Sequence, residues 1–270
     1  MLASAFTHAY VQNALAAGLL VALLSTCVGY FVVLRGAAFA THALSQIGFA
    51  GAAGAVLLGI EPLVGLIVFA VAGAVGIGAL SAGTRSRDVV TALVLVAALG
   101  TGALFLALAH AFASSVFSLL FGTIVGVDRT EVAVIAVATL VALAVLGVLA
   151  RPLLFATVAR ETATARGVPV VALDIAFLAV VGLAAAVTVP IVGTLLIYSL
   201  TVGPTAAAAC MTSSPVRTLT LAAALAVTAV VAGIAFAYAT DWPVGFFIAS
   251  ITALEYVAAR SLAYARGRTP

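Results

Sequence analysis

Long runs of apolar residues, interrupted by only a few polar positions, cover almost the whole chain of 270 residues. A helix needs about 20 apolar residues to cross the hydrocarbon core of a bilayer, where its backbone must satisfy its own hydrogen bonds. Only 7% of the residues are charged, whereas a soluble domain carries roughly 25%. The sequence therefore predicts an all-α bundle of membrane-spanning helices, in one integral-membrane domain over residues 1–270.

We expect eight to nine helices to cross the membrane, because two of the intervening turns are very short. The nine candidate segments are Val11–Leu34, Thr41–Gly59, Pro62–Ala82, Val89–Ala109, Thr130–Ala150, Val170–Val187, Ile191–Cys210, Val216–Tyr238 and Val244–Leu262. The frequent Gly and Ala residues would let these helices approach one another closely.

The arginines predict the orientation of the chain, because cytoplasmic loops of membrane proteins are enriched in basic residues. With nine spans and the N-terminus outside, ten of the 11 arginines fall on the cytoplasmic side, and only Arg129 lies outside. Glu61, Asp128, Glu131 and Asp241 would then lie on the outer face. The sequence thus predicts a multi-pass protein of the cell membrane with a cytoplasmic C-terminus.

The largest cytoplasmic connection, Arg151–Pro169, is expected to contain a short helix. Thr157 could begin this helix, and Gly167 with Pro169 would end it. Such a helix either rests on the bilayer surface or docks into a cytoplasmic partner. Its few apolar and basic residues argue against lipid anchoring.

The sequence lacks the common catalytic motifs. It contains no lysine, so it cannot form the phosphate-binding loop G-x-x-x-x-G-K-[ST], and it has neither an H-E-x-x-H helix nor a G-x-S-x-G turn. The net charge of +3 comes from arginines outside the apolar runs and gives no indication of nucleic-acid binding. We therefore expect a transport protein and not an enzyme.

Several stretches, in order along the chain, resemble the permease subunits of zinc- and manganese-type ABC importers. They are Val33-Leu34-Arg35 followed by Thr41–Ile47, Leu119–Val127, Glu161–Gly167, Val192–Leu196 followed by Pro204–Ala207, and Tyr238–Gly245. The resemblance implies a polytopic helical permease that imports a divalent metal, zinc or manganese, or a metal chelate, by alternating access.

The same resemblance implies the partners of the chain. They are ATPase subunits that bind ATP and Mg²⁺, an extracytoplasmic solute-binding protein and a second permease copy in a dimer. It also assigns Glu161, Ala163, Ala165 and Gly167 to a cytoplasmic helix that couples the permease to the ATPase.

The sequence departs from the family at the polar stretch of the second span. His42 and Gln46 occupy positions where the family has an Asp and a His that contact the metal, and their i, i+4 spacing places both on one helix face. Imidazole is a common zinc ligand and an amide a weak one, while manganese prefers carboxylate oxygens. Either His42, Ser45 and Gln46 line the substrate path, with His42 and Gln46 as metal ligands, or they only hold the bundle together by hydrogen bonds.

Two further polar features lie within the predicted spans. Pro204 removes a backbone hydrogen bond, so it could expose carbonyl groups to the substrate path or only adjust helix packing. Glu255 is expected to contact an arginine or interfacial water. The alternative function is a proton-sensitive secondary transporter or channel that uses His42, although Glu255 and Asp174 are the only acids expected within a span.

Overall fold

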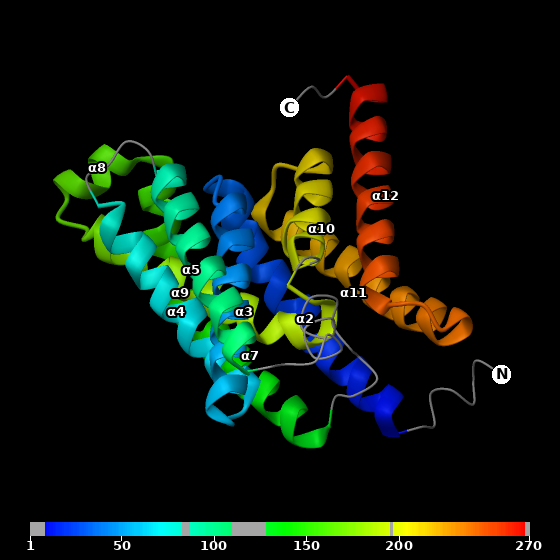
Figure 1. Cartoon of the computed structure of the whole chain (residues 1–270). Helices are drawn as coiled ribbons and strands as arrows, with labels where there is room; N and C mark the ends of the chain where they lie inside the picture. Colours follow the sequence, from blue (N-terminus) through cyan, green and yellow to red (C-terminus); the bar gives the residue numbers. More distant parts are fainter. Residues whose placement is uncertain (1–8, 83–86, 110–127, 195–196, 268–270) are drawn as a thin grey trace.

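The computed structural model describes residues 9–82, 87–109, 128–194 and 197–267 of the chain. The regular structure in these ranges is helical throughout. The helices are α2 (Ala9–Leu34), α3 (Ala38–Leu58), α4 (Pro62–Leu80), α5 (Arg87–Ala109), α7 (Arg129–Val158), α8 (Arg160–Ala165), α9 (Val170–Val192), α10 (Ile197–Met211), α11 (Pro215–Thr240) and α12 (Val244–Ala265) (Figure 1). The Leu119–Val127 segment lies outside the described residues.

Within the described ranges, eight helices are long and apolar enough to cross a membrane. A further apolar helix, α10, has 15 residues; at about 1.5 Å per residue it is shorter than a hydrocarbon core of about 30 Å. The prediction of an all-α bundle with eight to nine spans is confirmed. Several predicted boundaries differ. Helix α7 continues through Pro152 to Val158, and α9 continues through Pro190 to Val192, so the span predicted from Ile191 is a helix that begins at Ile197. Proline is tolerated in membrane helices where neighbouring groups satisfy the freed backbone.

Helix α2 lies between two groups of helices. Figure 1 shows α3, α4, α5 and α9 on one side of the bundle and α10, α11 and α12 on the other, and α2 packs against members of both groups. Helix α3 is the most enclosed of the long helices: 78% of its most apolar window is buried, against 11% for α5. The polar stretch of α3 is therefore held inside the protein, whereas α5 presents a face to lipid or to a partner.

Glycine residues allow the backbones of α3 and α4 to touch. A Cβ atom added at Gly51 would lie 2.2 Å from the carbonyl oxygen of Gly65, and one added at Gly65 would lie 2.3 Å from that of Gly51. No larger residue permits this approach, which is typical of helix association in lipid. The contact fixes the middle of α3 against α4, and with it the position of the polar residues in the first turns of α3.

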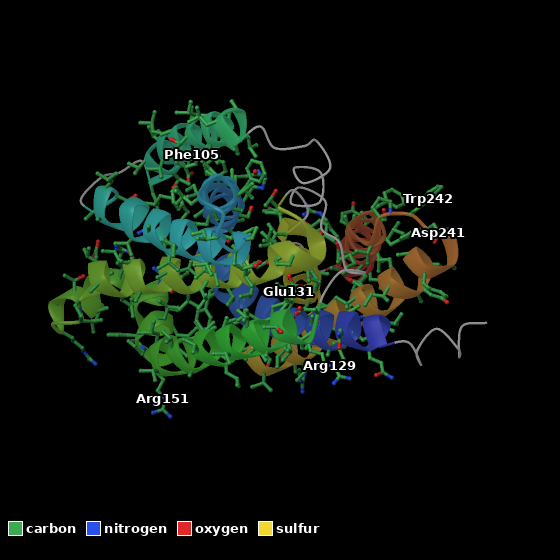
Figure 2. The ribbon with its side chains drawn as sticks, turned by 60° about the horizontal axis from the view of Figure 1, so that its bottom comes forward. Phe105, Arg129, Glu131, Arg151, Asp241 and Trp242 are labelled. Carbon is green, nitrogen blue, oxygen red and sulfur yellow. The ribbon has the colours of Figure 1, made fainter. Side chains whose placement is uncertain are left out.

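The ends of α7 and α8 follow signals present in the sequence. At the start of α7, the backbone N–H of Glu131 donates to the Asp128 carboxylate at 2.7 Å, and the N–H of Asp128 donates to the Glu131 carboxylate at 3.2 Å. Gly167 ends α8 with a left-handed φ of 78°, as predicted. In Figure 2, Arg151 lies at the other end of α7 from Arg129 and Glu131.

Candidate functional site

The polar stretch of α3 lies in the first two turns of this enclosed helix. Ser45 is fully buried, Gln46 is 6% exposed, and His42 is half-buried. Because α3 is unbroken from Ala38 to Leu58, His42 and Gln46 share one helix face, as the sequence predicted. Neither buried residue faces lipid, so their polar groups face protein or an internal path.

A break in the helical backbone lies against this stretch. Helix α9 ends at Val192, Gly193 adopts a φ of 88°, and Thr194 follows outside any helix. The Ser45 hydroxyl can donate either to the carbonyl oxygen of His42, at 2.7 Å, or to that of Thr194, at 3.1 Å. Non-helical backbone at membrane depth occurs only where protein buries it or where it lines a cavity, and Gly193 and Thr194 are both buried.

The sequence left open whether Pro204 exposes carbonyl groups or only adjusts helix packing. In the structure, Pro204 is buried inside one continuous helix from Ile197 to Met211, and the break lies before this helix. Gly193 was noted only as part of a family motif. The available signal was Pro190 followed by Gly193, a proline within the last turn and a glycine directly after it.

The break carries polar oxygen atoms of Thr194. The Oγ1 atom of Thr194 is buried and has no hydrogen-bond partner in the described structure. Within the described ranges, no three His, Cys, Asp or Glu residues group together as a metal site.

Within the short helix α8, one residue is buried against the bundle. Ala163 is fully buried, whereas Glu161, Ala165 and Gly167 are exposed. The four residues assigned to coupling therefore divide into an anchor and an accessible surface. Ala163 holds α8 in place, and the other three can meet a partner.

The predicted start of α8 at Thr157 is wrong. Thr157 belongs to the last turn of α7, where its hydroxyl donates to the carbonyl oxygen of Leu153 at 2.6 Å. The chain leaves the α7 helix at Ala159, and α8 begins at Arg160. A threonine hydroxyl that bonds back into its own helix cannot cap the next one.

A buried carboxylate lies beside α8, and sequence reasoning did not identify its role. Asp174, on α9, is 3% exposed and accepts hydrogen bonds from Arg35, from Arg87 at 2.7 Å and from Arg160 at 2.9 Å. Arg35 directly follows α2, Arg87 is the first residue of α5, and Arg160 is the first residue of α8. They therefore lie at one end of the bundle, as their distribution in the sequence predicted.

Arg35 is the most enclosed of the three arginines. Its guanidinium also donates to the Thr157 hydroxyl at 2.9 Å and lies 5.3 Å from the ring centroid of Phe177. Burial lowers the pKa of Arg35 from its ordinary value, and the charge of Asp174 opposes this shift. Because arginine is such a strong base, it keeps its charge and pairs with the carboxylate.

Glu255 does not contact the nearest arginine along its helix. Arg260 donates to the Tyr256 hydroxyl at 2.9 Å, and no ion pair of Glu255 occurs among the described residues. One carboxylate oxygen of Glu255 is buried without a hydrogen-bond partner in the described structure. The prediction that Glu255 contacts an arginine is therefore wrong for Arg260.

Comparison with known proteins gives a match over nearly the whole chain. The model of the ABC 3 transport family matches residues 7–263. The manganese transport system membrane protein MntC of Halalkalibacterium halodurans is 28% identical over 236 residues, covering 87% of this chain and 81% of that protein. The high-affinity zinc uptake system membrane protein ZnuB of Haemophilus influenzae is 23% identical, covering 90% of this chain and 94% of that protein.

Two solved structures share the fold. PsaBC from Streptococcus pneumoniae in complex with Fab has a TM-score of 0.85 at 23% identity, covering 96% of this chain and 94% of that chain. A metal-chelate type ABC transporter in an inward-facing conformation has a TM-score of 0.64 at 16% identity, covering 90% of this chain and 85% of that chain. The chain belongs to the ABC 3 transport family and is a multi-pass membrane permease.

Proposed function

We propose that this chain is the translocation subunit of an ABC importer for divalent metal ions of the zinc and manganese class. The observation that carries the proposal is the family match over nearly the whole chain, with relatives named for manganese and for zinc transport. The helical fold and the exposed face of α8 support it. The permease supplies the path, and ATP hydrolysis on a partner supplies the energy.

The substrate path is proposed to run between α3 and the break before α10. His42 and Gln46 would face it, Ser45 would hold the break through the carbonyl oxygen of Thr194, and Pro204 would lie within the helix that continues the path. An imidazole nitrogen and an amide oxygen are candidate ligands for the ion in transit. This pair suits zinc better than manganese, because manganese prefers carboxylate oxygens.

Partner subunits would complete the transporter. Two ATPase subunits, which bind ATP and Mg²⁺, would dock at the α8 end through the surface around Glu161, Ala165 and Gly167. A second permease copy would form a dimer with this one, and an extracytoplasmic solute-binding protein would deliver the ion at the opposite end. Closure of the ATPases would move α8 and switch the path between its outward and inward states.

A proton-driven carrier finds less support in the structure. Asp174 is one of two acids expected within a span, and three arginines neutralise it. A carboxylate held in this way does not take up and release protons readily. This leaves Glu255 without the relay of acidic groups that proton pumps use.

Reconstitution tests the proposed function. The permease, its ATPase and its solute-binding protein are placed in lipid vesicles, and ATP hydrolysis and metal uptake are measured with Zn²⁺, Mn²⁺ and Mg²⁺. We expect zinc to stimulate both processes more than manganese, with Mg²⁺ present only as the ATP counter-ion. An ATPase variant unable to hydrolyse ATP is the control. ATP hydrolysis and uptake that respond to no metal would refute the proposal.

Thiol labelling tests the proposed orientation. In a version without its two native cysteines, Glu61→Cys, Asp128→Cys and Asp241→Cys should react with an impermeant thiol reagent added outside intact cells. Arg166→Cys and Arg266→Cys should react only after the membrane is opened. The reverse pattern would show that the basic end of the bundle faces outward.

A further inference from the structure

The three ion pairs of the described structure all meet at Asp174, and they differ in how firmly they are held. The side chain of Arg35 is 6% exposed, whereas that of Arg87 is 35% exposed and that of Arg160 is 53% exposed. A buried ion pair resists separation, because removing one partner leaves an uncompensated charge. An ion pair open to water separates easily. Arg35 is thus the permanent partner of Asp174, and Arg160 is the one most easily released.

The permanent partner and the releasable partner contact different oxygens of the Asp174 carboxylate. Arg35 contacts Oδ1, while Arg87 and Arg160 both contact Oδ2, at 2.7 and 2.9 Å. Because two guanidinium groups share Oδ2, one can leave and the other still satisfies that oxygen. Release of Arg160 therefore does not leave a bare charge in the protein interior.

Arg160 and Asp174 also connect two helices, α8 and α9. Arg160 is the first residue of α8, which is otherwise anchored to the bundle by Ala163. Asp174 lies near the start of α9, and the far end of α9 leads into Thr194, beside Ser45. About 18 residues of helix, roughly 27 Å, connect the two sites. A displacement of α8 that pulls on Asp174 therefore reaches the candidate substrate path through a rigid helix.

We propose that the Arg160–Asp174 ion pair transmits movement of α8 to α9, and that Arg87 holds the carboxylate while Arg160 is released. The proposal rests on the proposed function, since it assumes that an ATPase moves α8. Arg160, Arg87 and Asp174 are positioning residues that do not touch the transported ion. Arg35 keeps the cluster assembled in both states.

Metal uptake and ATP hydrolysis, measured in the same vesicles with Zn²⁺, separate these roles. Arg160→Gln should lower the number of metal ions imported per ATP hydrolysed by about fivefold or more, the lower end of typical coupling between sites. Arg160→Lys, which keeps the charge, should restore part of this ratio. Arg87→Gln should slow uptake and hydrolysis together and leave their ratio unchanged, because releasing Arg160 would then leave Oδ2 unpaired.

Arg151→Gln is the matched control. Arg151 lies at the same end of the protein, is exposed, and points away from the bundle in Figure 2. Its variant should match the wild type in rate and ratio. Asp174→Asn is avoided as the main test, because three arginines would lose their partner and the protein could fail to fold.

The outcomes separate this inference from the proposed function. If the wild type itself shows no metal-stimulated hydrolysis, the proposed function fails and the inference with it. If the wild type transports metal and Arg160→Gln keeps its ratio within twofold, the transmission role is wrong. Loss of ATPase binding by Arg160→Gln, seen as failure to co-purify, would also overturn it, because Arg160 would then be a docking residue.

Discussion

Replacing Gly29 with alanine should separate α2 from α10 and destabilise the permease. Gly29 lies on α2, and Thr201 and Thr205 lie on α10. A Cβ atom added at Gly29 would be 2.0 Å from the carbonyl oxygen of Thr201 and 2.8 Å from the hydroxyl oxygen of Thr205. Ordinary van der Waals contact begins near 3.4 Å, so the Cβ atom would be about 1.4 Å too close to the carbonyl oxygen of Thr201. A side chain can rotate away from such a clash, but a backbone oxygen can move only with its helix.

The size of the effect follows from two opposing terms. Overpacking a filled interior lowers the free energy of unfolding by about 1–3 kcal/mol, and the backbone clash places Gly29→Ala at the upper end. The gain in helix propensity on replacing glycine by alanine offsets roughly 0.5–1 kcal/mol. A net loss of about 2 kcal/mol should lower the unfolding temperature by roughly 4–8 °C, given about 2–4 °C per kcal/mol for chains of comparable size.

Thermal unfolding in lipid nanodiscs measures this change, with the folded fraction followed by size-exclusion chromatography after heating. Gly147→Ala is the control, because Gly147 lies in α7 and a Cβ atom there would have no neighbour within 4 Å. That variant should unfold at or slightly above the wild-type temperature. If Gly29→Ala unfolds at the wild-type temperature while the control behaves as expected, α2 and α10 are not in backbone contact and the argument fails.

Four further substitutions test the proposed path and the proposed docking surface. His42→Ala should lower zinc-stimulated ATP hydrolysis at least severalfold without loss of assembly, because the imidazole is the stronger candidate ligand of the pair. Unchanged uptake per folded molecule would leave His42 a packing residue. Ser45→Ala should lower stability by about 1 kcal/mol through loss of the bond to Thr194, and a wild-type unfolding temperature would contradict that bond. Ala165→Arg should abolish co-purification with the ATPase while the permease stays folded, whereas Ala163→Arg should unfold it, since only Ala163 is buried; binding by Ala165→Arg would remove this face from the docking surface.

The sequence alone determined which segments are helices. Hydrocarbon cannot hydrogen-bond a peptide group, so a long apolar run has little choice but the helix, and its length sets the number of spans. The helix end at Gly167 was predicted for a similar reason. It depends on residues within one helical turn, where spacing along the chain is also spacing in space.

The tertiary structure decided which polar residues meet. Asp174 is separated from Arg35 by 139 positions, from Arg87 by 87 and from Arg160 by 14. No local pattern marks such a cluster, because it forms only when the helices pack. The hydrogen bond between Ser45 and Thr194, which are 149 positions apart, likewise forms only when the helices pack.

Packing also decided where the helices break and which of their faces stay accessible. A proline weakens a membrane helix, but neighbouring groups determine whether the backbone opens, so the chain continues through Pro204 and leaves the helix at Gly193. Ala163 and Ala165 are alike in the sequence, yet one is buried and the other exposed. The sequence thus determined the helical character of the chain and bounded the number of spans at eight to nine, through local hydrogen bonding and hydrophobic length. Contacts between distant helices determined the charged cluster at Asp174, the contact of Ser45 with Thr194 and the exposure of Ala165.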